Sequence, residues 1–175
     1  MLNSRFGEKN FGGYLGLNKS WGFTHLLFSH FNQKIGMVEG ERDENGNLIL
    51  EGYELTESLK KDRTPLVPSQ GIQHTKIALD NSFSLSNGGR FTFLTGYQQN
   101  QRKEFADVDA PDEPEAFFDL KTINYNAGYH LPESRGWKTS FGVNGMKQWN
   151  ENKAEEAIIP DYDLFDFGVY GVTAK

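Results

Sequence analysis

The chain is organised around two long runs of alternating apolar and polar residues, 69–85 and 90–105, which flank the turn-like Ser86–Gly89. Successive side chains of a strand point to opposite faces, so each run predicts a strand with one apolar and one polar face. Asn87-Gly88 accepts positive φ and predicts a tight hairpin between them. In the first run the apolar parity holds Thr75, Ile77, Leu79, Phe83 and Leu85, and the polar parity holds His74, Lys76, Asp80, Ser82 and Ser84.

The rest of the chain repeats this pattern between turns. The second run places Phe91, Phe93 and Tyr97 on one parity, and Leu94 interrupts the polar one. Further strands are predicted over 11–18, 22–40, 117–131, 137–149 and 164–175. A helix is the alternative for 22–40, where alternation is imperfect, but its glycines, aromatics and threonine favour a strand. The sequence therefore predicts an all-β fold, an antiparallel up-and-down meander of about seven to eight long strands.

The predicted connections alternate in length along the chain. Short ones lie around Lys19, Asn87 and Glu133, and long polar ones occupy 41–68, 106–116 and 150–162, the first with a possible small hairpin at Asn45-Gly46. In a meander every second connection lies at the same end of the sheet. Tight turns at one end and long acidic loops at the other are typical of outer-membrane barrels.

In such a barrel the polar parity would face the lumen, and aromatic residues near strand ends would lie at the membrane interfaces. The lumen-facing candidates are His74, Lys76, Asp80, Asn124, Asn126, Lys138, Asn144 and Gln148. The interface aromatics are Trp21, Tyr97, Tyr129, Trp137 and Trp149. A small soluble barrel is the alternative, with the apolar parity pointing inward around a small ligand.

Composition narrows the function classes. The 175 residues carry a net charge of −6, which disfavours nucleic-acid binding, because phosphate contacts need clustered Lys and Arg. Hydrophobic residues make up 37% and aromatics 14%, with 19 glycines, which fits many-stranded β structure. The absence of cysteine excludes disulfides and thiol chemistry. The N-terminal residues lack the apolar core of a secretory signal, and no apolar run is long enough for a transmembrane helix.

Catalytic and metal-binding motifs have little support. His25 and His30 are five residues apart and would point to opposite faces of one strand, and His74 and His130 lie on distant strands. Asp43–Asn47 has Asp-x-Asn-x-Asn spacing, but Leu48 stands where a calcium loop needs glycine, which favours a plain acidic turn over weak cation binding. No phosphate-binding loop, HExxH or GxSxG occurs, so we expect neither an enzyme, nor a metal site, nor a cofactor.

Several stretches resemble TonB-dependent outer-membrane receptors of the Bacteroidota type. These are LNKSWGFTHLLFSHFNQKIGMVEGERDENG, VPSQGIQHTKIALDNSFSL, GYQQNQRKEF and FFDLKTINYNAGYHLPESRGWKTSFGVNGM, within a resemblance that covers roughly 11–173. They match the barrel part of that family, so residues 1–175 are expected to form a single, partial segment from the middle of a transmembrane β-barrel, without plug or remaining strands.

The resemblance implies a function in the bacterial outer membrane. It implies TonB-dependent uptake of a scarce solute, such as an iron complex, a vitamin or a glycan, with this chain supplying part of the barrel wall. The implied partners are outer-membrane lipid, the plug and remaining strands of the receptor, the TonB system indirectly, and an unidentified small-molecule substrate. The alternative from the residues themselves is a soluble β-barrel that binds a small ligand.

Overall fold

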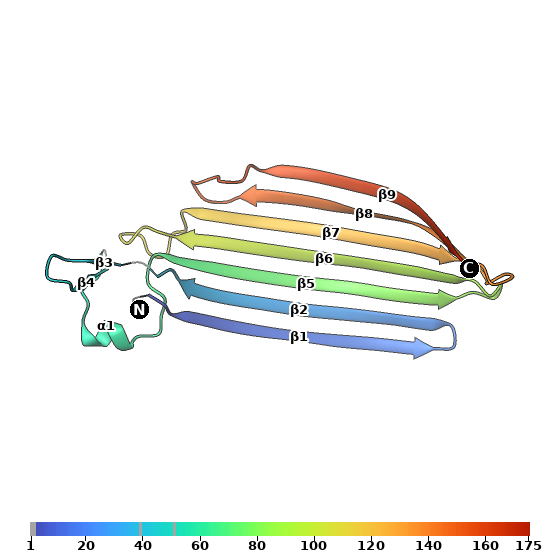
Figure 1. Ribbon diagram of the computed structural model, residues 1–175, viewed down its shortest axis with the longest axis horizontal. Helices are drawn as coiled ribbons and strands as arrows, with labels where there is room; N and C mark the ends of the chain where they lie inside the picture. The colour runs from blue at the N-terminus through green and yellow to red at the C-terminus, as the bar shows by residue number, and fades with distance from the viewer. Residues whose placement is uncertain (1–2, 39, 51) are drawn as a thin grey trace.

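The computed structural model describes residues 3–38, 40–50 and 52–175, and most of them belong to one antiparallel sheet of seven strands (Figure 1). The strand order in the sheet is β1-β2-β5-β6-β7-β8-β9, so each of these seven strands pairs with the one before it and the one after it along the chain. The strands are β1 (Phe6–Lys19), β2 (Gly22–Gly36), β5 (Ser69–Ser84), β6 (Arg90–Phe105), β7 (Ala116–His130), β8 (Lys138–Asn152) and β9 (Tyr162–Ala174). The predicted all-β antiparallel meander is confirmed.

The strands are long, from 13 residues in β9 to 16 in β5 and β6, against about 5–6 in ordinary globular proteins. β1 and β9 lie at opposite edges and do not pair with each other, so the sheet is open. The segment 22–40, for which a helix was the alternative, is a strand from Gly22 to Gly36. β1 begins at Phe6, five residues before the predicted start at residue 11.

The β5–β6 hairpin shows how the sequence sets the pairing. Gly88 adopts φ +81°, a backbone conformation that residues with a Cβ rarely accept, and its N–H donates to the Leu85 carbonyl at 3.0 Å. The Asn87 side chain accepts a further bond from the Gly89 N–H at 2.9 Å. The turn places Phe83 opposite Phe91 and Ile77 opposite Tyr97, so the apolar parities of both strands lie on the same face.

Tight turns gather at one end of the sheet and long connections at the other (Figure 1). At the loop end, residues 37–68 join β2 to β5 and hold a two-stranded hairpin, β3 (Glu41–Arg42) with β4 (Leu48–Ile49). The same connection contains α1 (Glu57–Lys61), a five-residue helix that the sequence pattern did not predict. No helix in the described parts of the chain is long and apolar enough to cross a membrane.

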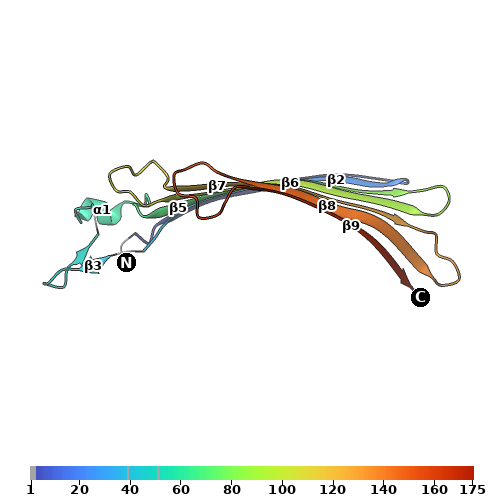
Figure 2. The same ribbon diagram turned by 90° about the horizontal axis from the view of Figure 1, so that it is seen from above.

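The sheet is a single layer with almost no hydrophobic core. Seen from its edge, no other element of the described residues covers either face (Figure 2). Among these residues the buried apolar side chains are Leu50, Val67 and Ala116, all at the loop end. Large apolar side chains in the strands stay exposed, for example Leu15 at 72% and Val169 at 74%. Strand pairing, rather than packing between layers, therefore holds the described structure together.

Asn3 ties the start of the chain to the loop end. Its side chain, 3% exposed, donates to the carbonyls of Met37, Leu66 and Pro68 at 2.7–3.0 Å and accepts from the Leu66 N–H at 2.9 Å. Its φ of +50° suits asparagine better than most residues. One amide thus joins the two ends of the 37–68 connection.

Replacing Asn3 with alanine should loosen this junction. A lost bond to a buried backbone group costs about 1–3 kcal/mol locally, so hydrogen exchange at the Leu66 N–H should accelerate about tenfold or more. Amides of β6 and β7 should keep their exchange rates. The control is Asn10→Ala in β1, an exposed position, which should leave Leu66 unchanged. Equal protection of Leu66 in Asn3→Ala and in the parent chain would show that the Asn3 amide is not the anchor.

Candidate functional surface: the two faces of the sheet

Strand register gathers the polar parities of all seven strands onto one side of the sheet, called here the polar face. Lys76 pairs with Gln98 and then Thr122, and Asp80 pairs with Leu94 and then Asn126. The eight residues predicted to face a lumen all lie on this face: His74, Lys76, Asp80, Asn124, Asn126, Lys138, Asn144 and Gln148. What they face in a larger assembly stays a prediction.

Side chains of the polar face are linked across strands. The Asn100 amide lies 3.1 Å from Nδ1 of His74. Gln148 donates to Thr122 Oγ1 at 3.0 Å and accepts from the Tyr162 hydroxyl at 3.0 Å. Amide and hydroxyl groups of this kind present both donors and acceptors to water or to a polar solute.

The Tyr170 hydroxyl donates to the Asn126 side chain at 3.1 Å, which extends these side-chain links to β9.

The polar face also carries apolar residues. Leu27 and Leu94 nevertheless lie on this face, and both are about 40% exposed. Leu94 is the exception that the alternation of 90–105 shows, and Leu27 lies in the imperfectly alternating segment 22–40.

The histidines do not form a cluster. His25 lies on the polar face and contacts Asn18 at 3.0 Å, whereas His30 lies on the opposite face and contacts Thr75 Oγ1 at 2.9 Å. His74 is near the loop end of β5 and His130 near the turn end of β7. Among the described residues, no group of three or more His, Asp or Glu is placed to hold a metal ion.

The opposite side of the sheet is called here the apolar face, and its apolar residues form a band that Asn81 and Lys147 interrupt. The band includes Phe11, Leu15, Phe28, Ile77, Leu79, Phe91, Phe93, Tyr125, Phe141 and Phe167. Rings pack within it, as between Phe11 and Phe28, whose centroids are 5.6 Å apart. Toward the loop end the same face becomes polar at Thr75, Gln99 and Lys121, which lie in one row across β5, β6 and β7.

The five aromatics predicted at membrane interfaces lie on the two sides of this band. Trp21 and Trp137 are in or beside tight turns, and Trp21 stacks on Phe83 with ring centroids 5.5 Å apart. Tyr129 is the penultimate residue of β7, next to the turn. Tyr97 lies in the middle of β6 rather than near its end, and Trp149 pairs with Lys121, so both lie where the apolar face becomes polar.

An ion cluster lies beyond the band on the same face, and the sequence did not reveal it. Asp119 is fully buried and pairs with Lys153 and, at 3.3 Å, with Lys121. Both lysines contact Oδ2 of Asp119, and Gln99 donates to Oδ1 at 2.6 Å. Glu151 lies 3.3 Å from Lys121. Asp119 and Lys121 share a strand parity, which is a weak signal, but Lys153 and Gln99 come from neighbouring strands.

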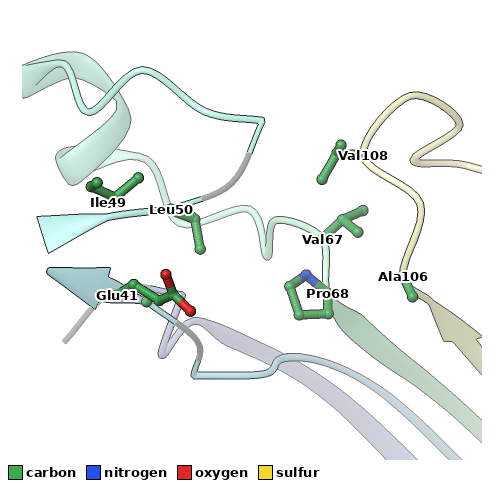
Figure 3. A pocket seen from close by; sticks show the side chains of 8 residues that line it. Glu41, Ile49, Leu50, Val67, Pro68, Ala106 and Val108 are labelled. Atoms are coloured by element: carbon green, nitrogen blue, oxygen red, sulfur yellow. The ribbon is translucent and has the colours of Figure 1, made fainter. Parts of the chain in front are cut away.

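The loop end contains a hollow of about 520 Å³ between two connections (Figure 3). Glu41, Ile49 and Leu50 border it from the β3–β4 hairpin, Val67 and Pro68 from the entry to β5, and Ala106 and Val108 from the β6–β7 connection. Apart from Glu41 its lining side chains are apolar, and two of them are the buried Leu50 and Val67. We interpret it as packing between loops.

The Asp43–Asn47 turn uses its carboxylate internally. Asp43 accepts bonds from the Asn45 N–H at 2.9 Å, from the Asn47 N–H at 2.7 Å and from the Asn47 side chain at 3.0 Å. These bonds, above all the one from the Asn47 side chain, lower the pKa of Asp43 below its ordinary value. This geometry agrees with the plain turn predicted at this position.

Comparisons with known proteins did not identify relatives of the chain. No family model matches it, and neither the curated proteins nor the solved structures that were searched gave a match.

Two aspartates of the apolar face offer a matched test of the ion cluster. Asp119→Asn removes a buried charge that two lysines and Gln99 bind, so the free energy of unfolding should fall by about 2 kcal/mol. Asp163 pairs with Lys147, and the Asp163 side chain is 67% exposed. Asp163→Asn should therefore change the free energy of unfolding by less than about 0.5 kcal/mol. Urea unfolding followed by tryptophan fluorescence measures both, because Trp149 lies beside Lys121. Equal losses would show that burial of Asp119 is not decisive.

Acid should loosen the β3–β4 hairpin through Asp43. Because the pKa of Asp43 in the folded chain is below its ordinary value, its stabilising effect is complete above that ordinary value and disappears as the pH falls through the folded pKa. The Asn45 and Asn47 N–H resonances should therefore shift together in an NMR titration at acid pH. In Asp43→Asn this transition should be absent. Its persistence in the variant would assign it to another carboxyl group.

Proposed function

We propose that this chain supplies part of the wall of a bacterial outer-membrane barrel for TonB-dependent uptake of a scarce solute. The observation that carries the proposal is a sheet with one polar face and one face whose apolar band has no cover among the described residues. A water-soluble protein rarely exposes a contiguous apolar surface of this extent. A lipid bilayer is a solvent in which such a face is stable.

The length of the band supports lipid as its cover. On β6 the apolar residues of this face run from Phe91 to Tyr97, and the face becomes polar at Gln99. Gln99 is eight residues from Phe91, which is about 26 Å along the strand. A tilted transmembrane strand needs about 9–11 residues, and the apolar band of outer-membrane barrels is about 25 Å tall. The same interval on β8 separates Phe141 from Trp149, and within it Lys147 is paired with Asp163 of β9.

The two ends of the sheet fit the two sides of such a membrane. Tight turns gather at one end, as on the periplasmic side of these barrels, and long connections at the other, as outside the cell. Trp21, Tyr129 and Trp137 on the turn side and Tyr97 and Trp149 on the loop side match two interfacial aromatic girdles.

The open edges imply further strands. Unpaired backbone groups are not tolerated in lipid, so β1 and β9 need partners, which in this proposal are other strands of the same receptor. The polar face then lines the lumen, where His74, Lys76 and Asp80 would contact water, the plug or the passing solute. Coupling to TonB, and a solute such as an iron complex, a vitamin or a glycan, rest on the family resemblance.

Spin labels on single cysteines can test which face meets lipid, because the chain has no cysteine of its own. Tyr125 and Asn126 are adjacent on β7 and lie on opposite faces. In phospholipid bilayers a label at residue 125 should be relaxed mainly by oxygen, which partitions into lipid. A label at residue 126 should be relaxed mainly by a water-soluble nickel complex.

Phe93 and Leu94 provide the matched control, because both are apolar but lie on opposite faces of β6. Residue 93 should behave like 125, and residue 94 like 126, if the face rather than the residue type sets the environment. A chain that is a compact monomer in plain buffer, with labels at 93 and 125 shielded from both reagents, would overturn the proposal. That result would favour the soluble barrel that binds a small ligand.

A further inference from the structure

A small hollow of about 170 Å³ lies over Gly71 on the apolar face, beyond the loop side of the band. Gly71 leaves this space because it has no side chain, and a Cβ built there would touch only the Phe105 ring, at 3.8 Å. Gly71 pairs with Lys34 on one side and with Lys103 on the other. The two lysines therefore flank the hollow from neighbouring strands, with Cα atoms about 10 Å apart.

Aromatic rings hold both ammonium groups beside the sheet. Nζ of Lys34 lies 4.9 Å from the centroid of Phe105, and Nζ of Lys103 lies 4.5 Å from the centroid of Phe117. Contacts of this type attract a cation without neutralising its charge. Both lysines are half-buried, so their positions are restricted.

This lysine pair has no counter-ion among the described residues. Three other lysines of the same face are paired: Lys121 and Lys153 with Asp119, and Lys147 with Asp163. Neither Lys34 nor Lys103 lies within 4 Å of a described carboxylate, and none of the side chains that line the hollow is acidic. Two fixed positive charges around an open hollow favour an anion.

The rows of residues between the hollow and the band supply hydrogen-bonding groups and show how far the hollow lies from the band. The amides of Asn32, Gln73 and Gln101 border it on the band side. One row further Thr75 and Gln99 follow, and the next row is the apolar Ile77 and Tyr97. An anion in the hollow would thus lie about 13 Å along the strands beyond the Thr75–Gln99 row, which in a sheet tilted by about 45° is about 9 Å in depth, at the outer side of the headgroup region.

We propose that the hollow over Gly71 binds the phosphate of an anionic lipid headgroup in the outer leaflet. Lys34 and Lys103 bind the phosphate oxygens, the three amides donate further bonds, and the acyl chains extend along the band. The inference rests on the proposed function, because it places this face in lipid. The two lysines favour an anion, and the apolar band on the same face favours a lipid phosphate over a soluble one.

Binding can be measured with the purified chain in maltoside micelles, which contain no phosphate. Phosphatidic acid added to the micelles should bind saturably in calorimetry. Lys34→Gln with Lys103→Gln should weaken this binding about 25-fold, since each lysine beside an anionic headgroup contributes about a factor of five. Gly71→Leu, which fills the hollow, should weaken it to a similar extent, and arginine at both lysine positions should preserve it.

Matched controls separate the site from general charge and apolarity. Lys19→Gln with Lys147→Gln removes the same charge from the same face far from the hollow and should leave the affinity unchanged. Gly13→Leu adds the same side chain as Gly71→Leu within the band, in open space, and should also have no effect. Circular dichroism of each variant identifies any that fail to fold.

Three outcomes would overturn the inference. Equal affinity for oleate would indicate unspecific attraction of any anionic lipid, and equal affinity for inorganic phosphate would exclude a lipid ligand. Equal losses in the Lys34/Lys103 and Lys19/Lys147 variants would exclude this hollow. The spin-label result at residues 93 and 125 is independent of Lys34 and Lys103. A lipid-facing band without phosphate binding therefore rejects only the site, and a shielded band rejects the proposed function.

Discussion

The stability of the sheet depends on what covers its apolar face. Strand pairing satisfies the backbone of the inner strands, but it does not remove the band from water. Phe165 is 64% exposed and Phe167 58%, and burial of such side chains is the main favourable contribution to folding. Because folded domains are stable by a small margin only, a sheet without a core needs another medium or another chain. Covering the band and folding the sheet are therefore coupled.

Alternation along single strands made much of the fold predictable. The period of two is local, so Ile77 and Lys76 could be assigned to opposite faces without knowledge of their neighbours. Asn87-Gly88 fixed the central hairpin because its backbone conformation is restricted. The start of β1 was missed because residues 6–10 alternate poorly and extend as a strand only through pairing with β2, as where Lys9 meets Asn32. α1 is too short for a helical period, and Thr56 defines its start by accepting from the Leu59 N–H.

Features that depend on cross-strand register could not be predicted. The eight polar residues share a face because parity suffices to place them. The Asp119 cluster requires that Gln99 lie beside β7 and Lys153 beyond the end of its partner β8, which only the pairing of three strands determines. Lys34 and Lys103 are distant in sequence and meet around Gly71 through two separate registers. A turn residue inserted between β5 and β6 would have separated them without changing any single-strand pattern.

The strands continue past the band by a length that has a consequence of its own. From Gln99 to Phe105 the ladder adds six residue steps, about 20 Å along the strand, in which both faces are largely polar. In a membrane these polar rows would lie outside the hydrocarbon and would hold the long connections at a distance from it. An insertion or substitution in those connections would disturb the hydrogen-bonded residue pairs of these rows before it reached the residues that contact lipid. In that setting the polar rows would separate the lipid-contacting part of the sheet from changes in the long connections.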